Sequence, residues 1–158
     1  MCDYSLQGLP NRLAAEGEDL VAHRFRTNTI GFASPQELQA IAEAQATQKR
    51  SGFWAAIKDL FIAETGPSAT AVCIPPGARL SLQDIPERLQ REFDVGLNEE
   101  VTFTQLTAQP YAYRDAVRFD NGREVWLQKF EPGQRAVVLS LALAEEVTDP
   151  ETAYAAVF

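Results

Sequence analysis

The sequence predicts an α+β domain, with a small antiparallel sheet or partly closed β-barrel and two to three helices packed against it. Two long stretches in the first half of the chain, around residues 35–49 and 53–63, carry apolar residues at helical spacing. From residue 71 onward, short runs rich in β-branched and aromatic residues alternate with turn residues. Within that half, Asn121-Gly122 separates two such runs, which is the strongest short-range hairpin signal.

The bulk composition is that of one globular domain. The 158 residues form a single unit, 1–158, in which residues 148–158 are a tail that can fray. Hydrophobic residues make up 46% and charged residues 23%, so a core can form without a metal or a disulfide to support it.

The charge excludes two classes of partner. The chain has 22 acidic and 14 basic residues, a net charge of −8. Such a surface repels phosphate backbones and anionic lipids, so we expect neither a nucleic acid nor a membrane as partner. Residues 1–20 lack the apolar core of a signal peptide, and no apolar run is long enough to span a membrane. We therefore expect a cytoplasmic protein whose two cysteines remain thiols.

Three helices are expected. Ser34-Pro35-Gln36-Glu37 resembles a capping box, with Ser34 as N-cap and Pro35 as the first helical residue, and this helix should fade at 49–52. A second helix should span 53–63. A short third helix should start at Ile85, with Asp84 as its cap.

The expected strands fall between turn signals. The Asn121-Gly122 pair should form a two-residue type I′ turn that pairs residues 116–120 with 123–127. Apolar and β-branched runs predict strands at 20–25, 27–33, 71–74, 79–82, 101–107, 116–119, 124–128 and 136–143.

Cys2, His23 and Cys73 are the side chains that suggest a metal site. They are the only cysteines and the only histidine in the chain. Removal of Met1 would give Cys2 a free α-amino group, so its amine and thiolate could chelate one ion, and His23 and Cys73 could complete a zinc or copper site. The spacing matches no zinc motif, and Cys73 lies in an apolar run where cysteine is often a small buried side chain.

Cys2 also supports a second hypothesis, in which the protein is a thiol enzyme. An N-terminal cysteine can attack a carbonyl with its own amine as base, and Asp3 or His23 could orient it. Class II amidotransferases have glycine after this cysteine, whereas Asp3 follows here. The chain contains none of the common nucleotide-binding or hydrolase motifs, so the sequence leaves open whether it is an enzyme.

The missing motifs favour a third hypothesis, a binding or assembly module whose partner is another protein or a second copy of the chain. Contact could be made through a sheet edge, through the C-terminal tail or through an aromatic surface. On alternating strands aromatic residues serve a core as readily as a recognition surface. The densest aromatic region consists of Tyr111, Tyr113, Phe119, Trp126 and Phe130.

Three stretches of the chain resemble a group of short uncharacterised bacterial proteins. They are the opening Met1-Cys2-Asp3-Tyr4-Ser5-Leu6, the run Ala71-Val72-Cys73-Ile74-Pro75-Pro76-Gly77, and the run Tyr113-Arg114-Asp115-Ala116-Val117-Arg118-Phe119. The resemblance implies a bacterial origin, and it brings no activity, ligand or partner with it.

Overall fold

The structure is a computed structural model that describes residues 6–50 and 68–141. Three features expected from the sequence lie outside these ranges: Cys2, the helix at 53–63 and the tail at 148–158. No helix in the described part of the chain is both long enough and apolar enough to cross a membrane.

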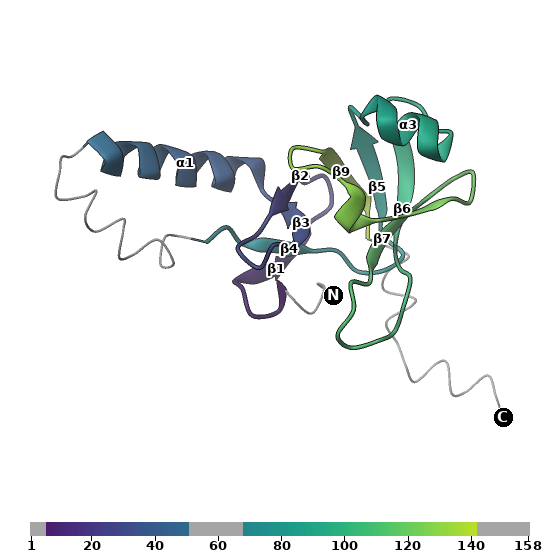
Figure 1. Cartoon of the computed structure of the whole chain (residues 1–158), viewed down its shortest axis with the longest axis horizontal. Coiled ribbons are helices and arrows are strands. Elements are labelled where there is room, and N and C mark those ends of the chain that lie inside the picture. Colours follow the sequence, from purple (N-terminus) through teal and green to yellow (C-terminus); the bar gives the residue numbers. More distant parts are fainter. Residues whose placement is uncertain (1–5, 51–67, 142–158) are drawn as a thin grey trace.

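The described elements are mostly strands, with a long helix at one side and a short helix at the other (Figure 1). The helices are α1 (Pro35–Arg50) and α3 (Glu87–Phe93), and a short 3-10 turn, η2 (Leu127–Lys129), lies later in the chain. The strands are β1 (Asn11–Leu13), β2 (Asp19–Arg24), β3 (Ile30–Ala33), β4 (Ala71–Cys73), β5 (Arg79–Gln83), β6 (Glu99–Gln105), β7 (Asp115–Phe119), β8 (Glu124–Trp126) and β9 (Arg135–Ser140).

The α+β class is confirmed, but the sheet differs from the expected small antiparallel one. Its nine strands form one sheet in the order β1-β4-β3-β2-β9-β5-β6-β7-β8. The sheet is mixed, because β1 runs parallel to β4 while the other neighbours are antiparallel. It is also open, since β1 and β8 remain its two ends. The sequence did not predict β1, a strand of three residues without an apolar pattern.

The main core lies inside the curl of this sheet. Phe32 and Val72 from one end and Val117 and Val125 from the other belong to a single buried cluster. Strands that are distant in the strand order can share one core only if the sheet bends around it. Strand pairing does not complete a ring, so the expected partly closed barrel is matched only in part.

A smaller core lies on the opposite face of β3 and β4. Ala33 and Cys73 are neighbours of the inward residues Phe32 and Val72, so their side chains point to the other face. The helix α1 covers this cluster only with its first two turns, and from residue 42 its described side chains are exposed. Figure 1 shows α1 extending away from the sheet.

The start of α1 was predicted correctly, but the capping box was not. The helix begins at Pro35, and the Leu38 N–H donates to the Ser34 carbonyl (3.1 Å). The Ser34 hydroxyl donates to Gln36 Oε1 (2.9 Å) and does not cap a backbone N–H. Glu37 turns to the sheet, where its Oε1 accepts bonds from the N–H (3.0 Å) and hydroxyl (2.8 Å) of Thr70. A tertiary contact thus replaces the expected local one.

The helix α3 starts two residues later than predicted. Pro86 is its N-cap, with φ −58° and ψ 142°. Asp84 has φ 56° and is not a cap, and its carboxylate pairs with Arg135 (3.3 Å). The helix ends at Phe93, and Asp94 is its C-cap, with a left-handed φ of 54°.

The hairpin at Asn121-Gly122 is confirmed, with a different turn. The Phe119 N–H donates to the Arg123 carbonyl (2.9 Å), and the Gly122 N–H donates to the Phe119 carbonyl (2.9 Å). Gly122 has φ 85°, and it is the only residue of this loop with a positive φ. The loop is therefore a type I turn followed by a left-handed glycine, and the predicted type I′ turn is wrong.

The side chain of Asn121 accounts for this difference. Its Oδ1 accepts the Arg123 N–H (3.0 Å), and its Nδ2 donates to the Phe93 carbonyl (2.9 Å) at the end of α3. Asn121 is therefore held by contacts that a free hairpin does not have. The three-residue loop places Ala116 opposite Trp126, one residue away from the predicted register.

Candidate functional site

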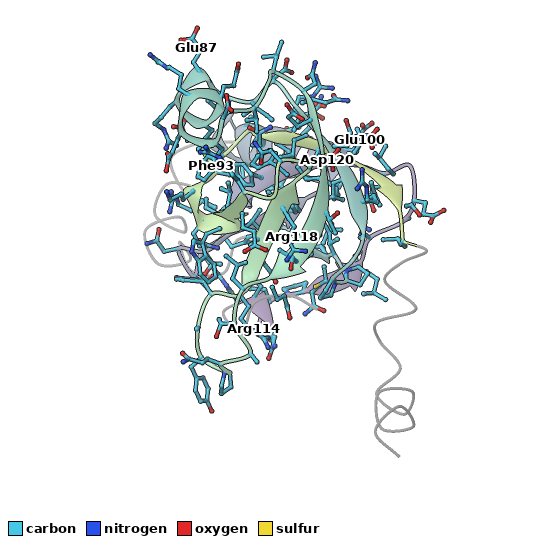
Figure 2. All side chains as sticks on the ribbon, turned by 90° about the vertical axis from the view of Figure 1, so that its right-hand side faces the viewer. Glu87, Phe93, Glu100, Arg114, Arg118 and Asp120 are labelled. Carbon is cyan, nitrogen blue, oxygen red and sulfur yellow. The ribbon has the colours of Figure 1, made fainter. Side chains whose placement is uncertain are left out.

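The loop between β6 and β7 presents the most exposed large aromatic side chain in the described part of the chain. Tyr111 is 84% exposed and Tyr113 is 40% exposed. The Leu106 N–H donates to the Arg114 carbonyl (2.9 Å), which closes the base of the loop. Figure 2 shows Arg114 at this base, at the opposite end of the strands from Glu100 and Asp120.

Two features inside the loop restrict its conformation. The Thr107 hydroxyl accepts the backbone N–H of Gln109 (3.2 Å), which forms a local turn. Pro110 then fixes its own φ and restricts Gln109 to extended conformations. Tyr111 follows directly, so a stiffened segment carries its ring into solvent.

Trp126 lies beside this loop on the outward face of the sheet. Ala116 shares that face with the exposed Arg118, yet Ala116 is completely buried. Its register partners are Thr104 on β6 and Trp126 on β8. The small Ala116 side chain therefore leaves room on the sheet for its larger neighbours.

Tyr113 and Trp126 form walls of an open pocket. Its volume is about 380 Å³, and Gln128 and Lys129 complete its lining in the described part of the chain. This volume lies within the roughly 300–1,000 Å³ typical of ligand pockets. We call these four residues the aromatic pocket.

Lys129 is fixed to α3. Its Nζ lies 2.6 Å from Glu92 Oε1 and 5.3 Å from the centroid of the Phe93 ring. Its carbonyl accepts a bond from Arg88 Nη2 (3.3 Å). Carboxylate and ring both stabilise the ammonium group, so its positive charge is compensated inside the protein.

Gln128 is fixed to β3. Its Oε1 accepts the Ile30 N–H (2.9 Å), and its Nε2 donates to the Ile30 carbonyl (2.8 Å). The pairing of β3 with β4 is at Phe32 and Val72 and does not extend to Ile30. The side-chain amide of Gln128 therefore makes the two hydrogen bonds that a neighbouring strand would make at Ile30. The floor of the pocket is thus tied to the far side of the curled sheet.

The structure divides the aromatic residues that the sequence groups together. Phe119 and Phe130 are buried in the main core, each 2% exposed. Tyr111, Tyr113 and Trp126 are on the surface. Gln128 and Lys129 were missed, because one polar and one basic residue after a strand carry no signal that they meet an aromatic wall.

Charged side chains on the outward face of the sheet are paired. Arg118, at the centre of Figure 2, donates to Glu124 Oε1 through Nε (2.8 Å) and Nη2 (2.6 Å). Arg79 lies 2.9 Å from Glu100. These pairs balance the positive charges of Arg118 and Arg79 on the outward face.

His23 and Cys73 reach the same face of the sheet but are separated by packed side chains. His23 pairs with Gly31 in β3, and continuing the Phe32–Val72 register by one residue places Cys73 on the other side of Gly31. A Cβ on Gly31 would lie 2.7 Å from Leu6 Cδ1 and 3.1 Å from Phe25 Cε2. Leu6 and Phe25 therefore occupy the space above the glycine.

His23 is half-buried beside an aromatic ring. Its ring contacts the Phe25 ring edge to face, with centroids 4.9 Å apart. Burial lowers the pKa of His23 below its ordinary value of 6.5. No group of three or more histidine, cysteine or acidic residues able to hold a metal occurs within residues 6–50 and 68–141. The predicted site also needs Cys2, which lies outside these ranges, so it stays a prediction.

Cys73 corrects one expectation from the sequence. It is disulfide-bonded in the structure and buried, and is not the free thiol expected of a cytoplasmic protein. Disulfides persist mainly in oxidising compartments. In this state the sulfur is not a thiolate, so the predicted metal site concerns only the reduced protein.

No protein-family model, no curated protein and no solved structure matches this chain. The resemblance of the Met1-Cys2-Asp3-Tyr4-Ser5-Leu6 opening to uncharacterised bacterial proteins therefore stays a prediction.

Proposed function

We propose that this protein is a binding module that receives a protein partner on the surface formed by Tyr111, Tyr113 and Trp126. The observation that carries the proposal is the open pocket walled by Tyr113 and Trp126 beside the exposed Tyr111. Tyrosine and tryptophan dominate the binding energy of protein interfaces, because each offers a large rigid area with few rotatable bonds.

The way the pocket is built supports this proposal. Its two aromatic walls come from a stiffened loop and from the sheet, and its polar lining is fixed to α3 and β3. A preorganised surface loses little conformational entropy when a partner binds. The other surfaces suggested by the sequence have less support: the edge strands β1 and β8 have three residues each, and the C-terminal tail is outside the described residues.

A peptide-display selection tests the proposal. We expect the full chain to select peptides from a random library, and we expect the Tyr111→Ala/Tyr113→Ala double variant to bind them at least about tenfold more weakly. Denaturant unfolding of the double variant and of the unmodified chain separates a loss of binding from a loss of stability. Leu97→Ala is the matched control, because Leu97 is 55% exposed and does not line the aromatic pocket.

The outcomes separate the alternatives. Peptides that bind the unmodified chain and the double variant equally would place the binding surface elsewhere. Sedimentation velocity of the same three proteins tests self-association: a dimer that the double variant cannot form would identify the partner as a second copy.

A further inference from the structure

Two polar groups that line the aromatic pocket, on Lys129 and Gln128, already have partners within the protein, and this limits what can bind there. The Lys129 ammonium is paired with Glu92 at 2.6 Å and lies against the Phe93 ring. An anionic ligand would have to compete with that carboxylate and would be repelled by it. The pocket is therefore poorly suited to phosphates and acidic peptides.

Gln128 offers equally little to a ligand. Its amide oxygen and its amide nitrogen are both bonded to the backbone of Ile30, at 2.9 Å and 2.8 Å. Using the amide for a ligand would break bonds that hold the curled sheet together. Sugars present hydroxyls that donate as well as accept, and the Gln128 amide oxygen is not free to accept from them.

The Trp126 indole N–H is a polar group at the pocket that makes no hydrogen bond within the described residues. The indole nitrogen donates and never accepts. The complementary ligand therefore has apolar bulk for the ring faces and carbonyl oxygens for this donor, and it needs no acceptor from the protein.

We infer that the aromatic pocket recognises a proline-rich segment in the polyproline II conformation, an inference that rests on the proposed binding function. Each proline lacks an N–H and presents a carbonyl that no internal hydrogen bond uses. Its flat ring packs on tyrosine and tryptophan faces, which is how aromatic-lined grooves recognise such helices. Tyr111, two residues from Tyr113 on the same loop, presents a further exposed aromatic ring to an extended ligand.

Fluorescence of Trp126 gives a direct test with the full chain. The chain has two tryptophans, so Trp54→Phe leaves Trp126 as the sole tryptophan. We expect capped decaproline to shift the Trp126 emission to shorter wavelength with saturation, and cellohexaose and inorganic phosphate to leave it unchanged. The Tyr111→Ala/Tyr113→Ala change should weaken the decaproline titration at least about tenfold, and Leu97→Ala should not.

A second variant isolates the indole donor. Trp126→Phe keeps an aromatic ring and removes the N–H, and calorimetry measures its binding without fluorescence. We expect decaproline to bind this variant more weakly while its thermal unfolding is cooperative. Unchanged affinity would overturn the role given to the indole.

The remaining outcomes distinguish this inference from the function it rests on. Saturable binding of cellohexaose or phosphate in place of decaproline would overturn the inference. If decaproline fails while library peptides without proline bind and require Tyr111 and Tyr113, the inference is wrong and the binding module stands. If neither decaproline nor any library peptide binds, both proposals fall.

Discussion

At the scale of single residues, this protein uses small and neutral side chains to make close packing possible. Gly31 is the register partner of His23, and Cys73 lies across from it on the other side. Because Gly31 has no side chain, Leu6 and Phe25 fill the space above it. The smaller core thus depends on an absent Cβ as much as on apolar side chains.

Substitution of Gly31 tests this packing. Gly31→Ala should lower the free energy of unfolding by about 1–3 kcal/mol, because the new Cβ overlaps Leu6 Cδ1 at 2.7 Å in a buried cluster. Gly8→Ala is the matched control, since a Cβ there meets nothing within 4 Å. Urea unfolding measures both, and equal stability of the two variants would contradict the packing argument.

His23 should make stability depend on pH. Its pKa is lowered by burial, so the unfolded chain takes up a proton before the folded chain does as the pH falls. The stability contributed by neutral His23 is fully present above about pH 6.5 and is lost as the pH falls through the folded pKa. We expect the stability difference between the unmodified chain and His23→Gln to shrink as the pH is lowered.

Urea unfolding from about pH 8 to pH 5 measures this difference at each pH. Carboxylates contribute to both proteins, so subtracting one curve from the other removes them. Parallel curves would show that the His23 ring titrates equally in the folded and unfolded chains.

At the scale of elements, tertiary contacts decide how helices and turns begin and end. The first turn of α1 is fixed by the Glu37 carboxylate on Thr70, which immediately precedes β4. Asn121 is held by the end of α3 in the same way. In both cases a side chain that can satisfy a local motif bonds to a segment distant in the sequence.

Two substitutions at the start of α1, one just before the helix and one in its first turn, separate the local cap from the tertiary contact. Glu37→Ala should cost about 1–2 kcal/mol, because it leaves the half-buried N–H and hydroxyl of Thr70 without their acceptor. Ser34→Ala should cost less than about 0.5 kcal/mol, because its hydroxyl bonds only to Gln36. The exposed Glu43→Ala on the same helix is the control for helix propensity.

Thermal or urea unfolding gives all three values. A larger loss for Ser34→Ala than for Glu37→Ala would restore the capping box that the sequence predicts. A loss for Glu43→Ala as large as that for Glu37→Ala would show that the acidic side chains act through the helix and not through Thr70.

At the scale of the whole molecule, a side chain links regions of the sheet that strand pairing leaves apart. Gln128 follows β8, the last strand of the order, and bonds both backbone groups of Ile30 in β3. The same residue lines the aromatic pocket, so closure of the curl and positioning of the pocket share one contact.

Removal of this contact should lower the free energy of unfolding of the whole domain. Gln128→Leu should cost about 2–4 kcal/mol, because the N–H and carbonyl of Ile30 both lose their partner in a half-buried place. Gln128→Glu accepts from the N–H but places a carboxylate against the carbonyl, so its stability should improve relative to the unmodified chain when acid protonates it. Gln39→Leu, on the exposed side of α1, should change stability by less than about 0.5 kcal/mol.

Denaturant unfolding at neutral and acidic pH measures these variants. An unchanged free energy of unfolding for Gln128→Leu would mean that the curl is maintained by the apolar core alone. Peptide binding by the same variant then shows whether the pocket depends on the link.

The sequence by itself determined the properties that come from short-range pattern. Alternation of apolar residues located eight of the nine strands to within a few residues, and Pro35 marked the first residue of α1. The Asn121-Gly122 pair located the hairpin. These features follow from backbone preferences and burial periodicity, which neighbouring residues specify.

The tertiary structure decided everything that depends on residues far apart in the chain. It placed Phe119 in the core and Tyr113 and Trp126 around one pocket, although all are aromatic residues of the same region. It brought Gln128 to Ile30 across 98 residues. A sequence pattern shows which face of a strand is buried, but the curvature of the sheet determines which distant faces meet, and the site is formed where they do.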